Sequence, residues 1–102
     1  MTKKAFRTVE ADGWIIYKNE NGKVHRDDGP AMIAPNGYQS WYKNDIHHRD
    51  NGPAAILPNG TQYWYKNGKL YRKNGPALIW ANGIQIWFKN DKYHRKIKMD
   101  PQ

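Results

Sequence analysis

Histidine is the residue type in this chain best suited to catalysis or metal binding, and its placement is periodic. His25, His48 and His94 are each followed by Arg and fill one recurring slot, which Tyr71 fills in another copy. A zinc ion needs its histidine ligands at about 2.0 to 2.1 Å. Equivalent histidines in successive copies of a pattern lie too far apart to share one ion. The spacing therefore predicts neither a metal site nor a catalytic histidine.

The other candidates for catalysis are sparse. The 102 residues contain no cysteine, which excludes disulfides, thiolate metal sites and cysteine nucleophiles. No nucleophile elbow, phosphate loop or paired-carboxylate constellation occurs. Aspartates fall where turns are expected, and Asp favours turns for backbone reasons; they are Asp27, Asp28, Asp45, Asp50 and Asp91. We expect a protein that is not an enzyme, with no catalytic residue and no cofactor.

Basic residues recur at the same period and indicate binding chemistry. The spacing is 23 residues for Arg26, Arg49, Arg72 and Arg95, and again for Lys43, Lys66 and Lys89. One interpretation is an electrostatic groove for nucleic acid, in which exposed Tyr or Trp stack on bases. The other is that the arginines brace Gly-Pro turns through carbonyls and through Asp27, Asp50 or Gln side chains. Residues locked to a repeat period usually serve the fold, which favours bracing.

The positive charge is concentrated in the second half of the chain. Residues 1–51 hold eight basic and seven acidic residues, whereas residues 52–102 hold nine basic and two acidic ones, out of a net charge of +8. Such a balance favours acidic partners. We take the cluster near the C-terminus as a candidate partner-binding surface: Lys89, Lys92, Arg95, Lys96 and Lys98.

The whole pattern is an internal repeat. It reads W-[YF]-K-N-[GD]-x-x-[HY]-R-x-x-G-P-A-x-I-x-x-N-G-x-Q-x, and Tyr42, Tyr65 and Phe88 are each 23 residues apart. The first aromatic-Lys-Asn box, at Tyr17, lies 25 residues before Tyr42, which places a two-residue insertion in a turn near Glu20. A unit of this length is one supersecondary element, and recurrent Gly, Pro and Asn-Gly argue against helix.

Strands and turns follow from the same pattern. Aromatic and β-branched runs bounded by Asn-Gly predict hairpins, with strands near 30–34 and 38–43, 53–57 and 61–66, 76–80 and 84–89, and end strands near 14–18 and 92–98. Pro35, Asn36 and Gly37 suit a three-residue loop whose glycine adopts the left-handed conformation. Such a loop pairs Ala34 with Tyr38 and fixes the register of the whole hairpin.

That register assigns side chains to two faces. Invariant residues of each copy share one face and form the expected repeat core, with Trp lying over Ala or Ile: Ala31, Ile33, Trp41, Ala54, Ile56, Trp64, Ala77, Ile79 and Trp87. The opposite face varies but stays apolar. We expect loops around the Arg-x-x-Gly-Pro segments to cover one face, and a partner to meet the variable face through Tyr42, Tyr65, Trp80 and Phe88.

The repeat resembles MORN repeats, and more closely the variant WYKNGKxHRxxGPA of many bacterial, phage and giant-virus proteins. "WYKNGKLYRKNGPA" at 64–77 is a near match and "WYKNDIHHRDNGPA" at 41–54 a weaker one, within a resemblance that spans 14–95. Arg26, Arg49, Arg72 and Arg95 follow the His slot where ordinary MORN repeats have Gly. The resemblance implies an elongated twisted antiparallel sheet, a non-enzymatic role and a binding partner.

We therefore predict an all-β protein, an open, twisted antiparallel meander of tandem 23-residue MORN-like hairpins. Residues 1–13 form an N-terminal leader or capping strand, 14–98 the repeats and 99–102 a C-terminal tail. The function hypothesis is a protein-protein interaction module. The resemblance implies a phage-type inhibitor or adaptor that acts on a host protein as one form of it. The alternatives are a nucleic-acid-binding protein that uses the basic C-terminal half, and binding to an anionic membrane surface.

Partners and location follow from the same features. A protein partner is expected, with nucleic acid and a homodimer through the apolar sheet face as alternatives. The N-terminal stretch has no apolar signal segment and no apolar run reaches the length of a transmembrane span. The expected location is the cytoplasm, that of the host cell for a phage-encoded protein.

Overall fold

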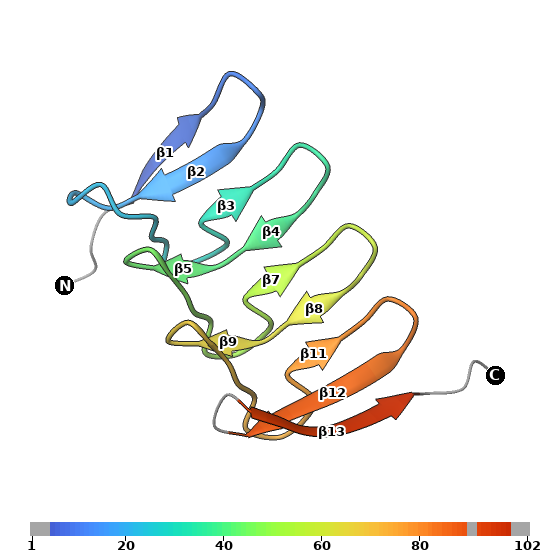
Figure 1. Ribbon diagram of the computed structural model, residues 1–102. Helices are drawn as coiled ribbons and strands as arrows, with labels where there is room; N and C mark the ends of the chain where they lie inside the picture. Colours follow the sequence, from blue (N-terminus) through green and yellow to red (C-terminus); the bar gives the residue numbers. More distant parts are fainter. Residues whose placement is uncertain (1–4, 90–91, 99–102) are drawn as a thin grey trace.

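The computed structural model describes residues 5–89 and 92–98, and every regular element within them is a β-strand. Nine strands form one antiparallel sheet that is not closed into a barrel, and four more form two small hairpins (Figure 1). This confirms the predicted all-β class and the open antiparallel meander. The sheet strands are β1 (Phe6–Val9), β2 (Ile15–Lys18), β3 (Met32–Ile33), β4 (Gln39–Ser40), β7 (Ala55–Ile56), β8 (Gln62–Tyr63), β11 (Leu78–Ile79), β12 (Ile84–Lys89) and β13 (Lys92–Lys98).

Three-residue loops set the register of the sheet hairpins, as the Pro-Asn-Gly triplet predicts. The N–H of Ala34 donates to the carbonyl of Tyr38 at 2.9 Å, and Gly37 has a φ of 97°. Asn36 closes the loop by accepting from the N–H of Tyr38 at 3.0 Å. The backbone pairs of the other two loops, Leu57–Thr61 and Trp80–Ile84, have the same arrangement. Loop chemistry therefore fixes which side chains share a face.

Successive hairpins join through equivalent strand pairs. Ser40 lies opposite Ala55 between β4 and β7, and Tyr63 lies opposite Leu78 between β8 and β11. A side chain also links hairpins, because the hydroxyl of Thr61 accepts from the N–H of Ala81 at 3.1 Å. Each hairpin thus adds two strands to the sheet, and its outer strand forms backbone hydrogen bonds with the first strand of the next hairpin.

The two small hairpins are absent from the sequence-based prediction, which runs one strand over 38–43 and another over 61–66. In the structure each run breaks at its tryptophan, Trp41 or Trp64, and the chain continues into a separate hairpin. The first hairpin pairs β5 (Tyr42–Lys43) with β6 (Ile46–His47), and the second pairs β9 (Tyr65–Lys66) with β10 (Lys69–Leu70).

Positive φ angles in two-residue loops produce these extra hairpins. The values are 49° at Asn44 and 67° at Asp45, then 52° at Asn67 and 80° at Gly68. Positive φ at both central residues is the requirement of a type I′ hairpin, and Asn, Asp and Gly adopt it readily. The dipeptides Asn-Asp and Asn-Gly in the aromatic-Lys-Asn box therefore encode a second turn in each unit.

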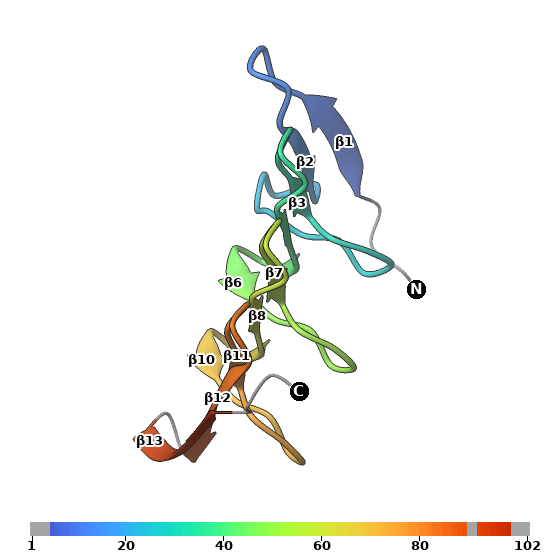
Figure 2. The same ribbon diagram turned by 90° about the vertical axis from the view of Figure 1, so that its right-hand side faces the viewer.

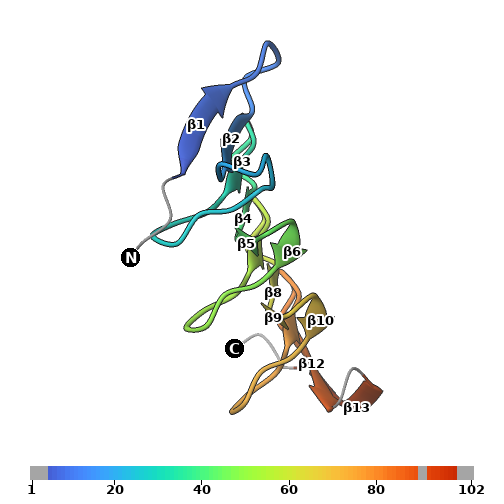
Figure 3. The same cartoon turned by 90° about the vertical axis from the view of Figure 1, so that its left-hand side faces the viewer.

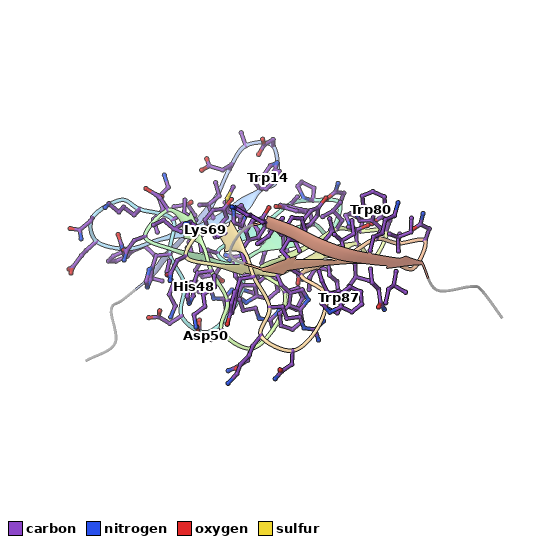
Figure 4. The ribbon with its side chains drawn as sticks, turned by 60° about the horizontal axis from the view of Figure 1, so that its bottom comes forward. Trp14, His48, Asp50, Lys69, Trp80 and Trp87 are labelled. Carbon is purple, nitrogen blue, oxygen red and sulfur yellow. The ribbon has the colours of Figure 1, made fainter. Side chains whose placement is uncertain are left out.

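The sheet has two distinct faces. Paired residues place Ile16, Met32, Ser40, Ala55, Tyr63, Leu78 and Ile86 on one side, and Ile15, Ile33, Gln39, Ile56, Gln62, Ile79 and Gln85 on the other. Trp14 and Trp80 lie on the first side, which we call the aromatic face, whereas Trp87, His48 and Asp50 lie on the second, the loop face (Figure 4). This confirms the two-face assignment made from the loop register.

The segments that contain Arg-x-x-Gly-Pro and connect one unit to the next lie on the loop face. The small hairpins project from the opposite side of the sheet (Figures 2 and 3). The described residues therefore form a thin body, with extents of 44 × 28 × 18 Å. Fully buried side chains are small, and Ala31, Ala54 and Ala77 are each 0% exposed. A larger apolar cluster of Leu78, Ile84 and Ile86, with Tyr63 and Phe88 packed against it, occupies the C-terminal part of the aromatic face.

Replacing Thr61 by Val tests the link between hairpins. The variant keeps the shape of the side chain but removes the acceptor for the Ala81 N–H, so we expect a loss of about 1 kcal/mol in the free energy of unfolding. Thermal or urea unfolding measures it. The control is Thr8→Val, because Thr8 is exposed and only donates to the carbonyl of Ile16. Equal effects of the two substitutions would contradict a specific role for Thr61.

Candidate functional site

Each described arginine of the Arg-x-x-Gly-Pro segments is held between an aromatic ring and a glycine. The guanidinium carbon of Arg49 lies 4.0 Å from the ring centroid of Trp41, and a Cβ added to Gly52 would lie 2.7 Å from that carbon. The Nη1 group of Arg49 donates to the carbonyl of Pro53 at 3.0 Å. We call this arrangement, a guanidinium between an aromatic ring and a glycine with a hydrogen bond to the proline carbonyl, the arginine bracket. The same bracket is formed by Tyr17, Arg26, Gly29 and Pro30, and by Trp64, Arg72, Gly75 and Pro76.

These contacts show that the three arginines brace the Gly-Pro turns. The sequence-based prediction that Trp lies over Ala or Ile did not foresee that Trp41 and Trp64 each carry a guanidinium on the ring. A guanidinium on an indole face gains cation–π attraction, which increases where water is excluded. The side chain of Arg95, the fourth member of the predicted ladder, lies outside the described residues.

The aspartates after the arginines have different partners from those predicted. Asp27 and Asp50 pair with His25 and His48 rather than with arginine, at 3.0 and 2.8 Å. Asp28 is the carboxylate that pairs with Arg26, at 2.9 Å from Nε. That hydrogen bond lowers the pKa of Asp28 below its ordinary value. The carboxylate that reaches the guanidinium of Arg26 thus belongs to the residue after Asp27, and the residue after Asp50 is Asn51.

Histidine in the recurring slot locks one unit to the next. Nδ1 of His25 accepts from the N–H of Asn44, and Nδ1 of His48 accepts from the N–H of Asn67, both at 3.1 Å. Because Nδ1 accepts, the ring proton resides on Nε2 and is donated to the aspartate. The hydrogen bond from His48 in turn lowers the pKa of Asp50, with Lys43 adding attraction at 3.8 Å. No cluster of three potential metal-ligating side chains occurs among the described residues.

In the part of the chain that the structure describes, two neighbouring clefts open between loops on the loop face. The first cleft, of about 490 Å³, is lined on its charged sides by Arg26, Asp27, Asp28, Lys43, Arg49 and Asp50. The second cleft, of about 420 Å³, is lined by Arg49, Asp50, Asn51, Trp64, Lys66, Tyr71, Arg72, Lys73 and Asn74. Both are within the size range of ligand pockets. Cations and carboxylates balance in the first cleft, whereas four cations face a single carboxylate in the second.

A stack of aromatic rings connects the small hairpins to the aromatic face. His47 lies between Tyr42 and Tyr65, with ring centroids 4.2 and 4.8 Å apart, and Tyr65 lies 6.2 Å from Tyr63. The Nε2 atom of His47 is buried and finds no hydrogen-bond partner among the described residues. Burial also lowers the pKa of His47 below its ordinary value. Burial similarly raises the pKa of Tyr42.

The predicted partner-binding residues separate into two groups. Tyr42, Tyr65, Trp80 and Phe88 all belong to the aromatic side, where Trp80 is 39% exposed and Phe88 packs against the apolar cluster. Lys92 and Lys96 are exposed on β13. The side chains of Lys89, Arg95 and Lys98, and the tail 99–102, lie outside the described residues. The aromatic group thus shares one surface, and His47, which the sequence analysis left unassigned, joins two of its rings.

Comparison with known proteins finds no matching family model, no matching curated protein and no matching solved structure. Within the described residues, no helix has the length and apolar character needed to cross a membrane.

A double-mutant cycle on Arg49 and Gly52 tests the bracket. Gly52→Ala places a methyl group against the guanidinium, so we expect a loss of about 1–3 kcal/mol in the free energy of unfolding. In the Arg49→Ala background the same change meets no guanidinium and should cost little, because Gly52 does not have the positive φ that disfavours alanine. Chemical unfolding of the four proteins measures the coupling. Additive effects would show that Gly52 and Arg49 do not pack together.

His47→Phe tests the effect of pH on the aromatic stack. An unfolded histidine titrates near 6.5, and the lowered pKa of folded His47 means that the unfolded chain binds more protons as the pH falls below this value. The wild type therefore loses stability from about pH 7 downward until the folded pKa is reached. Phe keeps the stacking but does not titrate, so the stability advantage of the variant should grow between pH 8 and pH 5. Thermal unfolding at both pH values gives the difference, and a constant difference would contradict this assignment.

Proposed function

We propose that this chain is a non-enzymatic protein-binding module that docks on another protein through the aromatic face. The observation that carries this proposal is that the main sheet is a single layer. Of the described elements, only the two small hairpins project from its aromatic side, and they do not form a second sheet across it (Figures 2 and 3). Aliphatic and aromatic side chains run along this face from Trp14 and Met32 to Tyr63, Leu78 and Trp80, and several remain half-exposed.

Exposed apolar surface of this kind is typical of interaction sites. Soluble monomers rarely expose large contiguous apolar patches, and those that occur mark binding surfaces. Trp and Tyr are also enriched in interface cores, because their rings bury a large area. Trp14 contacts Tyr38 edge-on, with centroids 6.2 Å apart, and so holds a preformed ring pair at the N-terminal part of the face. A partner would meet this pair without reordering it.

The charge of the chain favours a different protein over a second copy. The net charge is +8, so two copies brought face to face repel one another. Exposed Lys69, on the small hairpin β9–β10, lies on the aromatic side (Figure 4). Exposed Lys96 lies opposite Ile86 of that face. The partner expected from these features has an apolar patch bordered by carboxylates, since complementary potentials steer association.

The MORN-like assignment belongs to the same proposal. It is supported by the resemblance of residues 64–77 to the WYKNGKxHRxxGPA variant, and by the recurrence of the arginine bracket in three successive units. Proteins of that kind act by binding rather than by catalysis. On this basis we propose an inhibitor or adaptor of the phage type that acts in the cytoplasm of a host cell.

Trp80→Lys tests the docking face, because it places a charge at the exposed tip of the apolar surface without entering the buried cluster. We expect at least a tenfold weaker interaction with the bound protein, measured after photo-crosslinking from position 80 has identified that protein in the expressing cell. Val9→Lys is the matched control, because Val9 is 60% exposed and pairs with Ile15 on the opposite side of the sheet. Equal loss in both variants, or a stable homodimer by light scattering, would overturn the proposal.

A further inference from the structure

The three described arginine brackets are alike in geometry but differ in the acids beside them. The residues that follow each arginine read Asp-Asp-Gly after Arg26, Asp-Asn-Gly after Arg49 and Lys-Asn-Gly after Arg72. The number of carboxylates therefore falls from two to one to none along the chain. Because the fold is the same in all three, this change alters the charge of the loop face and leaves the bracket intact.

Loss of the second aspartate leaves two arginines without an ion-pair partner. Asp28 accepts from Nε of Arg26 at 2.9 Å, and the equivalent positions after Arg49 and Arg72 are Asn51 and Asn74. Among the described residues, neither Arg49 nor Arg72 has a carboxylate within ion-pair distance. Each donates through Nη1 to one proline carbonyl and keeps further N–H groups. Asp28 thus marks the position on the bracket that suits an anion.

The second cleft gathers these arginines with two lysines. Arg49 and Arg72 line it from neighbouring loops, together with Lys66 and Lys73. Its one carboxylate, Asp50, is already engaged by His48 at 2.8 Å and by Lys43 at 3.8 Å. Partial burial lowers the pKa of Arg49, which reflects a cation that has lost water. An anion that enters the cleft replaces this lost solvation.

An exposed aromatic ring borders the same cleft. Tyr71 is 42% exposed and occupies the slot that His25 and His48 fill in the preceding units. Those histidines donate to Asp27 and Asp50, whereas Lys73 takes the aspartate position after Tyr71, so the third slot loses its carboxylate. The ammonium group of Lys66 lies 5.8 Å from the Tyr71 ring. A ring beside several cations is the arrangement with which proteins bind single-stranded nucleic acid, where bases stack and phosphates pair with basic side chains.

We propose that the second cleft binds single-stranded nucleic acid, with phosphodiester groups on Arg49, Arg72 and Lys73 and a base on Tyr71. In the first cleft, Asp28 occupies on Arg26 the place that a phosphodiester takes on Arg72. The first cleft is therefore closed to the ligand by its own carboxylates. This site lies on the loop face and is independent of the protein-docking function proposed for the aromatic face.

The decisive variant gives the loop after Arg72 the sequence of the loop after Arg26. Lys73→Asp with Asn74→Asp produces Arg-Asp-Asp-Gly, a sequence that this fold already accommodates at residues 26–29. Binding is measured by fluorescence anisotropy of a labelled oligodeoxythymidine of about 12 nucleotides, within the usual site size, in about 50 mM salt. We expect at least a tenfold loss of affinity with an unchanged melting temperature. The slope of log K against log salt should also become shallower, because fewer phosphates are neutralised.

Matched variants separate a site from general charge. Lys69→Asp with Asn36→Asp makes the same change in net charge away from the cleft, and should alter affinity less than about threefold if the cleft carries the binding. Asp28→Asn removes the internal carboxylate of the first cleft and should raise affinity or add a second binding event. Tyr71→Phe should retain binding and Tyr71→Ser should weaken it, which a purely structural role of the loop cations does not explain.

Several results would overturn the proposal. They are absence of oligonucleotide binding by the wild type, equal losses in the cleft variant and the charge-matched variant, and competition by poly-glutamate as effective as by unlabelled oligonucleotide, which would indicate an acidic protein ligand instead. Tripolyphosphate that competes as well as the oligonucleotide would remove the role of the base. Trp80→Lys should leave oligonucleotide binding unchanged, so failure of the docking proposal and failure of this one can be told apart.

Discussion

The fold depends on one contact: an arginine side chain held flat between an aromatic ring and a glycine. In two units the bracket ties the loop that follows a small hairpin back to the tryptophan at which the sheet strand ends, Trp41 or Trp64, and in the first unit it ties Arg26 to Tyr17 within β2. A hydrogen bond to the proline carbonyl orients each arginine. Glycine suits this position because a Cβ would lie 2.7 to 2.8 Å from the guanidinium carbon, so the arginine would have to shift away from the ring. A thin sheet with few fully buried side chains has little core of its own, so these polar and cation–π contacts supply the side-chain packing that a second layer would otherwise provide.

Much of this architecture can be read from the sequence, because it depends on local backbone chemistry. Pro-Asn-Gly fixes a three-residue loop, the loop fixes the register, and the register assigns Ile56 and Gln62 to one face and Ala55 and Tyr63 to the other. The extra hairpins were missed although Asn67-Gly68 is a strong turn signal, because the hydrophobic run through Trp64 reads as one continuous strand. The strand ends at Trp64, whose ring receives Arg72 from a loop eight residues later, and periodicity does not reveal this contact.

The candidate surfaces were only partly predictable for the same reason. Arginine periodicity indicates either a groove or a brace, and only the distances show that bracing and anion binding can coexist on one guanidinium. The sequence itself shows the residues that distinguish the clefts, which are Asp28 in the first unit and Asn51 and Asn74 at the equivalent positions of the next two. Their meaning depends on knowing that Asp28 reaches the Nε atom of Arg26. Likewise, the role of His47 as a ring between Tyr42 and Tyr65 depends on a contact between neighbouring units, which one unit's sequence does not specify.

Because the sheet is a single layer, consecutive letters of a strand belong to opposite surfaces. Ala55 and Ile56 are adjacent in the chain, yet Ala55 belongs to the aromatic face and Ile56 to the loop face. Substitutions at odd and even strand positions therefore affect different faces, so the residues of one face can vary while those of the other are conserved by selection. A library randomised at alternate codons of the strands would therefore change the side chains of one face and leave those of the other face unaltered.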